Sequence, residues 1–182
     1  MTRLVIALLA GLLGAGIVHI VAVLAVPRLA DADLVDRAEA LGARDRFVAL
    51  PQDDPMLRAA LCLVALDEPA RVFAGGDVPF WSASVVTPTG ISIYSTNDRT
   101  ARERTLDVIV LNAGQVDTLR EELSEDAPEL VAVDAGEAIV VLRALVPDAT
   151  FAPAVEALLG EASCAPLEID PGTTGALAPP TR

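Results

Sequence analysis

The residue types that could do chemistry in this chain are concentrated in one stretch, DVPFWSASVVTPTGISIYSTNDR (77–99), which holds the only tryptophan and the only tyrosine. Two aromatic rings beside an amide, a carboxylate and a guanidinium can form a shallow ligand pocket. The candidate ligand-binding residues are therefore Trp81, Tyr94, Asn97, Asp98 and Arg99. The alternative is structural, because strand alternation places Trp81, Ala83 and Val85 on one face, where Trp81 and Tyr94 would pack across a hairpin. The pattern favours packing over binding.

Catalytic candidates are few. The single histidine, His19, lies in an apolar N-terminal run, so the remaining residues supply no imidazole for Ser-His-Asp or Cys-His catalysis or for a histidine-ligated metal. The sequence shows neither a GxxxxGK[ST] loop nor a GxGxxG loop for phosphate binding. Acidic pairs occur at Asp53–Asp54 and Asp67–Glu68, but neither has the spacing of a calcium-binding loop. We expect no catalytic residue, metal or cofactor; a carboxylate-dependent hydrolase or isomerase is the alternative.

The charge distribution narrows the possible partners. The formal net charge is −13, all 13 basic residues are arginines, and the 26 acidic residues begin at Asp31. Such an acidic surface repels nucleic acid and anionic lipid headgroups. A role in nucleic-acid binding is therefore excluded from the expected functions.

Residues 4–26 read LVIALLAGLLGAGIVHIVAVLAV and contain no formally charged side chain. As a helix rising about 1.5 Å per residue, this run crosses a hydrocarbon core of about 30 Å. It is longer than the roughly 7–15 apolar residues of a signal-peptide core. We predict an uncleaved signal anchor over 1–27, in a bacterial inner membrane, with the rest of the chain facing the periplasm. A cleaved signal peptide is the alternative. Because arginines lie on both flanks of the segment (Arg3 and Arg28), the positive-inside rule gives only a weak preference for one orientation.

One face of this apolar segment carries small residues at a regular spacing. Ala7, Gly11, Ala15 and His19 are each four residues apart, and small residues at that spacing let two membrane helices approach closely. This stripe predicts association of the segment with a second copy or with another membrane protein. The alternative is a plain tether, since alanine and glycine are common in membrane helices.

The two cysteines, Cys62 and Cys164, are too far apart for a CxxC redox or zinc motif. In an oxidising compartment two cysteines can form one disulfide bond. The alternative is a pair of buried thiols, because free cysteine is often fully buried.

The remaining pattern indicates a small β-rich domain. Residues 28–50 mix aspartate and arginine and predict a solvated stalk with one short helix over 34–41. Short runs of β-forming residues, separated by Gly, Pro and Asp, predict about seven strands, at 57–66, 70–74, 80–87, 91–95, 106–111, 130–133 and 138–146. Helical spacing predicts two flanking helices, over 113–123 and 151–162. We expect a mainly β (α+β) fold, an antiparallel β-sandwich over 51–164, followed by a disordered tail over 165–182.

The order of these segments resembles a known family. The series PQDDPMLRAALCLVAL, EPARVFAGGDVPFWSASVVTPTG, ISIYSTNDR, LDVIVL and AIVVLRALVPD, spanning about 54–147, is similar to the domain of unknown function 1254. The chain looks like the short, membrane-anchored members of that family. The resemblance implies an immunoglobulin-like β-sandwich of unassigned activity. The expected function is a non-catalytic, membrane-anchored envelope domain that binds a partner or a small-molecule ligand.

Overall fold

The computed structural model describes residues 2–30, 34–51, 54–123 and 127–167, in two units that divide the chain at 1–34 and 35–182. The first unit contains helix α1 (Thr2–Ala30). Its part from Thr2 to Ala25 has a mean hydropathy of 2.6 and is long and apolar enough to span a membrane. The helix continues past Pro27, where the sequence predicted its end; a proline removes one backbone hydrogen bond from a helix but does not always terminate it.

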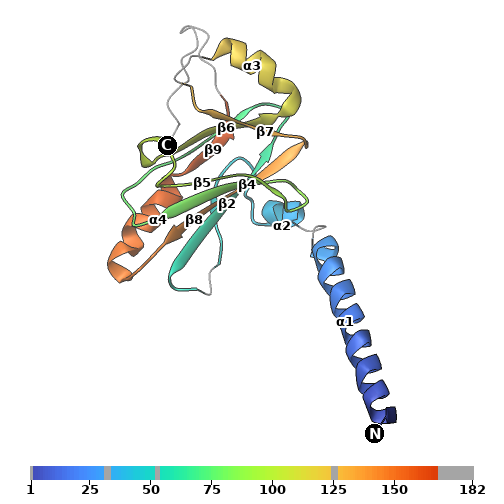
Figure 1. The fold of residues 1–182 in the computed structure, drawn as a ribbon. Coiled ribbons are helices and arrows are strands. Elements are labelled where there is room, and N and C mark those ends of the chain that lie inside the picture. The colour runs from blue at the N-terminus through green and yellow to red at the C-terminus, as the bar shows by residue number, and fades with distance from the viewer. Residues whose placement is uncertain (1, 31–33, 52–53, 124–126, 168–182) are drawn as a thin grey trace. The chain divides into compact units, whose positions relative to one another are not determined.

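The second unit is an α+β domain built on two sheets (Figure 1). The first sheet has the order β1–β2–β8–β4–β5, and the second has the order β7–β6–β3–β9. The strands are β1 (Val48–Ala49), β2 (Leu57–Ala65), β3 (Ala70–Ala74), β4 (Trp81–Val86), β5 (Ser92–Asn97), β6 (Leu106–Asn112), β7 (Glu129–Val133), β8 (Glu137–Leu145) and β9 (Ser163–Pro166). The helices are α2 (Leu34–Ala40), α3 (Val116–Glu122) and α4 (Ala152–Glu161), and single 3-10 turns η2 (Arg102–Arg104), η3 (Ala113–Gln115) and η4 (Ala149–Phe151) precede β6, α3 and α4.

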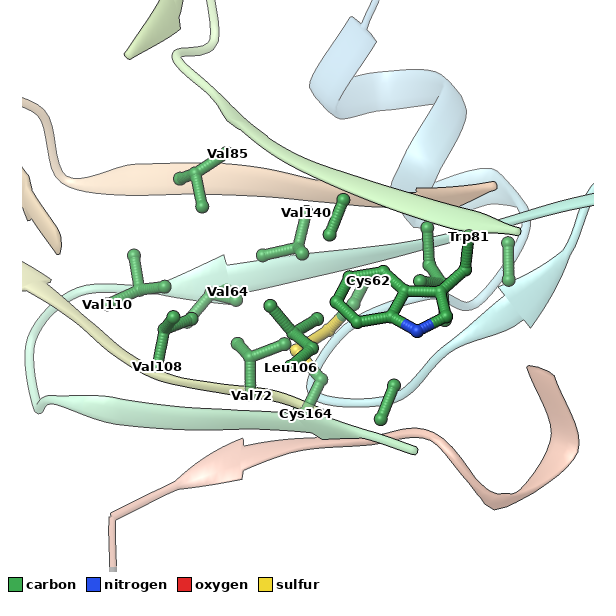
Figure 2. Packing of buried hydrophobic residues seen from close by; sticks show 14 of the residues in the cluster. Cys62, Val64, Val72, Trp81, Val85, Leu106, Val108, Val110, Val140 and Cys164 are labelled. Carbon is green, nitrogen blue, oxygen red and sulfur yellow. A yellow bond between two sulfur atoms is a disulfide. The ribbon is translucent and has the colours of Figure 1, made fainter. Parts of the chain in front are cut away.

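Alternating side chains build the core between the two sheets. In β4 the side chains of Trp81, Ala83 and Val85 are buried while the intervening residues are only half-buried, as the sequence pattern predicts. One continuous cluster of buried side chains draws on strands of both sheets, which therefore pack face to face. Figure 2 shows side chains of this cluster, among them Val64, Val72 and Trp81, directed toward one another between the strands.

The second sheet is mixed, which corrects the expectation of a wholly antiparallel domain. Strands β6 and β7 run parallel, with Val108 opposite Glu129 and Asn112 opposite Val133. Parallel neighbours need a crossover connection. Here η3 and α3 supply it, in the region where a helix was predicted. A capping box starts the turn: the Asn112 side-chain oxygen accepts from backbone amides of the first turn, and the Gln115 side-chain oxygen accepts from the Asn112 backbone amide.

The segment before the first long strand belongs to the domain. From Val35 onward the chain lies in the second unit, Ala38 and Ala43 are fully buried, and β1 pairs with β2. These residues therefore do not form the stalk predicted over 28–50; small alanines inside a charged sequence provide a buried face that composition alone hides. β1 and β9 were likewise not expected, whereas the short helix predicted over 34–41 is present as α2. The predicted tail at 165–182 overlaps β9, and residues 168–182 lie outside the described part of the chain.

A disulfide bond joins the two sheets. Cys62 of β2 and Cys164 of β9 are bonded, with their Cα atoms 6.5 Å apart, and they are 102 positions apart in sequence. Figure 2 shows this bond in the core together with the indole of Trp81. Of the two alternatives for the cysteines, bond or buried thiols, the structure has the bond.

We expect denatured but unreduced protein to contain no free thiol, and reduction to expose two. Opening a loop of about a hundred residues is worth up to about 4–5 kcal/mol in the chain-entropy model, so Cys62→Ala/Cys164→Ala should unfold at a much lower urea concentration. Maleimide labelling followed by intact mass measures the thiols, and tryptophan fluorescence measures unfolding. Two labelled thiols before reduction would contradict the bond.

Candidate functional site

A groove of about 670 Å³ opens between the two sheets on the side away from the disulfide bond. β7 pairs with β6 only from Val108 onward, so the start of β6 runs past the end of its neighbour and faces β5 across the opening. Its lining includes Phe73 of β3, Tyr94 and Thr96 of β5, and Leu106, Asp107 and Val108 of β6. The loop before β6 and the residues leading into β7 complete the lining.

A hydrogen bond spans the groove between β5 and β7, the edge strands of the two sheets. The Tyr94 hydroxyl donates to the Glu129 carboxylate over 2.9 Å. Burial, together with the acceptor Glu129, raises the pKa of Tyr94 above its ordinary value. Tyr94 is therefore a protonated donor at neutral pH, and its bond to Glu129 fixes both walls of the groove.

The loop that carries Glu103 into the groove is held in a strained backbone conformation. Glu103 and Arg104 have φ values of 54° and 56°, in the left-handed region that costs a side-chain-bearing residue about 1–2 kcal/mol. The indole N–H of Trp81 donates to the Arg104 carbonyl over 3.2 Å. The Arg104 guanidinium donates to the Val78 carbonyl and to Asp98, each over 3.2 Å. The core tryptophan and these two acceptors together keep the loop in place.

Asp98 is the one buried charged residue among the described positions. Its Oδ2 accepts from Arg104, while its Oδ1 finds no protein partner in the described residues. The side chain of Asp98 is 5% exposed and that of Arg104 is 57% exposed. Asp98 does not line the groove, so its role is to anchor the loop through Arg104.

The structure separates the five residues predicted as a ligand site. Tyr94 lines the groove, but Trp81 is completely buried. Tyr94 lies opposite Val85, and the Asp98 amide donates to the Trp81 carbonyl, so the two aromatic residues sit at different places along the hairpin. The predicted Trp81–Tyr94 cross-strand pair is therefore wrong, because register depends on where the turn falls.

Asn97 and Arg99 serve the turn after β5 rather than the groove. The Asn97 side-chain oxygen accepts from the backbone amides of Arg99 and Thr100, over 2.9 and 3.2 Å. This is the local hydrogen bonding that asparagine provides in turns. The Arg99 side chain is exposed.

The groove residues that sequence reasoning missed come from strands far apart in sequence. Phe73 of β3, Asp107 of β6 and Glu129 of β7 meet Tyr94 only after the sheets pack. Both oxygens of Asp107 are bound by Arg71, over 2.9 and 2.8 Å. A charged residue within each of two otherwise apolar strands, ARVFA and LDVIVL, was the available signal for this pair.

Metal binding finds no support in the described ranges, where no three His, Cys, Asp or Glu side chains gather in a way that could hold an ion. The carboxylates of the groove instead have hydrogen-bond donors of the protein as neighbours: Asp107 has Arg71 and Glu129 has Tyr94. The groove therefore combines aromatic and apolar side chains with three carboxylates, those of Glu103, Asp107 and Glu129, and with the guanidinium of Arg102.

Comparisons with known proteins bear on the fold alone. No family model and no curated protein matches this chain. Among solved structures, the VPA0106 protein of Vibrio parahaemolyticus aligns with a TM-score of 0.55 at 10% identity, over 76% of this chain and 33% of that one. An uncharacterized protein from Burkholderia cenocepacia aligns with a TM-score of 0.44 at 14% identity, over 60% of this chain and 34% of that one. The chain thus spans about a third of the length of each neighbour.

The Asp98–Arg104 pair leads to an asymmetric prediction. Arg104→Ala leaves the buried Asp98 carboxylate without its partner and should lower the unfolding free energy by about 2–3 kcal/mol. Asp98→Ala should cost only about 1 kcal/mol, because water can solvate the exposed Arg104 guanidinium. Urea unfolding of the full chain in detergent micelles, followed through Trp81 fluorescence, measures both. A larger loss for Asp98→Ala would contradict this account.

Proposed function

We propose that the chain is a membrane-anchored binding module of the bacterial envelope, with the groove between β5 and β6 as its binding site. The observation that carries this proposal is the state of the groove carboxylates. Arg71 occupies both oxygens of Asp107, and Tyr94 occupies one oxygen of Glu129. Such groups are fixed as hydrogen-bond acceptors, which suits recognition of a ligand better than proton transfer.

A carboxylate-dependent hydrolase or isomerase is the second candidate. It is favoured by the presence of three carboxylates, those of Glu103, Asp107 and Glu129, in one groove. An acid and base pair needs one carboxyl group that can hold and release a proton next to the substrate. Glu103 is the one of the three without a hydrogen bond that fixes its side chain in the described contacts, so it would have to serve as that group.

The location in the envelope rests on two features. α1 is long and apolar enough to anchor the chain, and the Cys62–Cys164 bond is of the kind that persists in oxidising compartments. Both support an inner-membrane anchor with the domain in the periplasm. The stripe of Ala7, Gly11, Ala15 and His19, four residues apart in α1, supports association of that helix with a partner in the membrane.

We further propose that the domain is an immunoglobulin-like sandwich of the domain of unknown function 1254 family. A tryptophan in the same core as a disulfide bond between two sheets is a feature of immunoglobulin-like sandwiches, which supports membership in the domain of unknown function 1254 family with its implied fold. The parallel β6–β7 pair and its helical crossover depart from the immunoglobulin pattern.

The topology can be tested with two reporters fused after Arg182. Alkaline phosphatase folds in the periplasm and green fluorescent protein in the cytoplasm, so we expect activity of the phosphatase fusion alone. The fusion should remain in the membrane fraction after an alkaline carbonate wash. Fluorescence without phosphatase activity would overturn the orientation, and a washed-off product beginning near Val26 would overturn the anchor.

Binding in the groove can be tested by photo-crosslinking in native membranes. A benzoyl-phenylalanine at Thr96, which lines the groove, should acquire an adduct on irradiation, whether the occupant is a protein or a small molecule. The matched control is the same residue at Glu156, exposed on α4. Intact mass and gel mobility report the adduct. An unmodified Thr96 variant, or equal yields at both positions, would contradict the proposed site.

A further inference from the structure

The edge strands of the two sheets are protected to different degrees. At the far edge of the first sheet β1 has only two residues, and in the second sheet β9 has four and ends at Pro166. β7 begins with Glu129 directly after Pro128. Short length, proline and charge are the devices that keep a sheet edge from pairing with another chain.

β5 has none of these three devices, although its register with β4 shifts between Val85 and Val86, so its regular pairing runs from Tyr94 to Asn97. Its six residues, SIYSTN, include no charge, proline or glycine, and β4 is its single neighbour in the sheet. Ile91, just before the strand, and Ile93 within it are 63% and 41% exposed. This is the longest uncharged edge in the described part of the domain.

The hydrogen-bond register shows which backbone groups of β5 face outward. The Asp98 amide donates to the Trp81 carbonyl, so residues two and four positions earlier, Thr96 and Tyr94, also direct their backbone groups toward β4. The N–H and C=O of Ser95, between them, consequently point to the open edge. Asn97 is already occupied, since its carbonyl accepts from the amides of Thr100 and Ala101.

The side chains beside this edge define what a bound strand would carry. A strand added to β5 would direct alternate side chains toward the face on which Tyr94 and Thr96 line the groove. The exposed charged residues of the groove lining are Glu103, Glu129 and Arg102. Two carboxylates and one guanidinium leave this lining with a net negative charge, to which a basic side chain is complementary.

We propose that β5 accepts a strand from a partner polypeptide, which places a lysine or arginine side chain in the groove. The proposal rests on the groove being the binding site, and it names the class of ligand. Main-chain hydrogen bonds to the edge would give affinity, and the groove would give specificity, as in other domains that bind by strand addition. A second copy of this chain pairing through its own β5 does not fit, because SIYSTN offers no basic residue and the chain carries a net charge of −13.

The test is selection of random short peptides displayed on phage against the full chain in detergent micelles. We expect enriched peptides to be rich in β-branched residues and to contain lysine or arginine. Ser95→Pro removes the outward N–H and should lower phage recovery at least about tenfold, a loss of about 1.4 kcal/mol. The matched control Ser95→Ala, which keeps the N–H, should recover the phage as well as wild type does.

Two further measurements keep the result independent of the folding of Ser95→Pro. Two versions of an enriched peptide should be compared, one N-methylated on its odd-numbered amides and one on its even-numbered amides. One version should lose binding and the other should keep it, because only every second amide of an added strand faces β5. Glu103→Gln/Glu129→Gln should bind peptides without a preference for basic residues.

The outcomes distinguish strand addition at β5 from ligand binding in the groove. Strand addition would be overturned if Ser95→Pro recovered as much phage as wild type, or if both methylated peptides lost binding equally. Enrichment of acidic peptides would overturn it as well. If the Thr96 crosslink still forms in those cases, the groove remains a binding site for another ligand. If neither crosslink nor enrichment is found, both proposals fail.

Discussion

The position of the disulfide bond decides where this domain can open. The Cys62–Cys164 bond holds β2 of one sheet to β9 of the other, and the buried cluster extends from it between the sheets. Covalent closure on that side leaves the opposite side, where β5 and β7 face each other, as the place where the sheets can separate. There, a hydrogen bond between Tyr94 and Glu129 crosses the gap. A strong tie on one side and a polar contact on the other yield a groove instead of a closed core.

The core and the groove are coupled through a single side chain. The indole of Trp81 is buried among the apolar residues, yet its N–H reaches the carbonyl of Arg104 in the loop that lines the groove. A buried indole N–H needs a partner, and here the partner is a residue in a left-handed conformation. Packing thus supplies the free energy that keeps Glu103 and Arg104 strained, and this links the stability of the core to the shape of the site.

The elements could be predicted from the sequence because each is encoded locally. Alternation in FWSASVV and helical spacing in 113–123 are signals carried by neighbouring residues. The pairing of β6 with β7 could not be predicted, because LDVIVL and LVAV read the same in parallel and antiparallel sheets. The groove could not be predicted either, because Tyr94, Phe73 and Glu129 meet only through strand order and register, which depend on the whole domain. Tyr94 was singled out for its rarity in the chain, and its real neighbours came from other strands.

An unprotected edge strand is normally a risk of aggregation, and the charge of this protein explains how such an edge can persist. The acidic residues are spread over the chain from Asp31 onward, so two copies approaching edge to edge repel each other before their backbones can pair. β5 itself carries no charge that would add to this repulsion locally. The net negative charge of the chain attracts a basic polypeptide. Long-range charge therefore disfavours pairing with a second copy of the chain, while the backbone edge of β5 stays available to a partner of opposite charge.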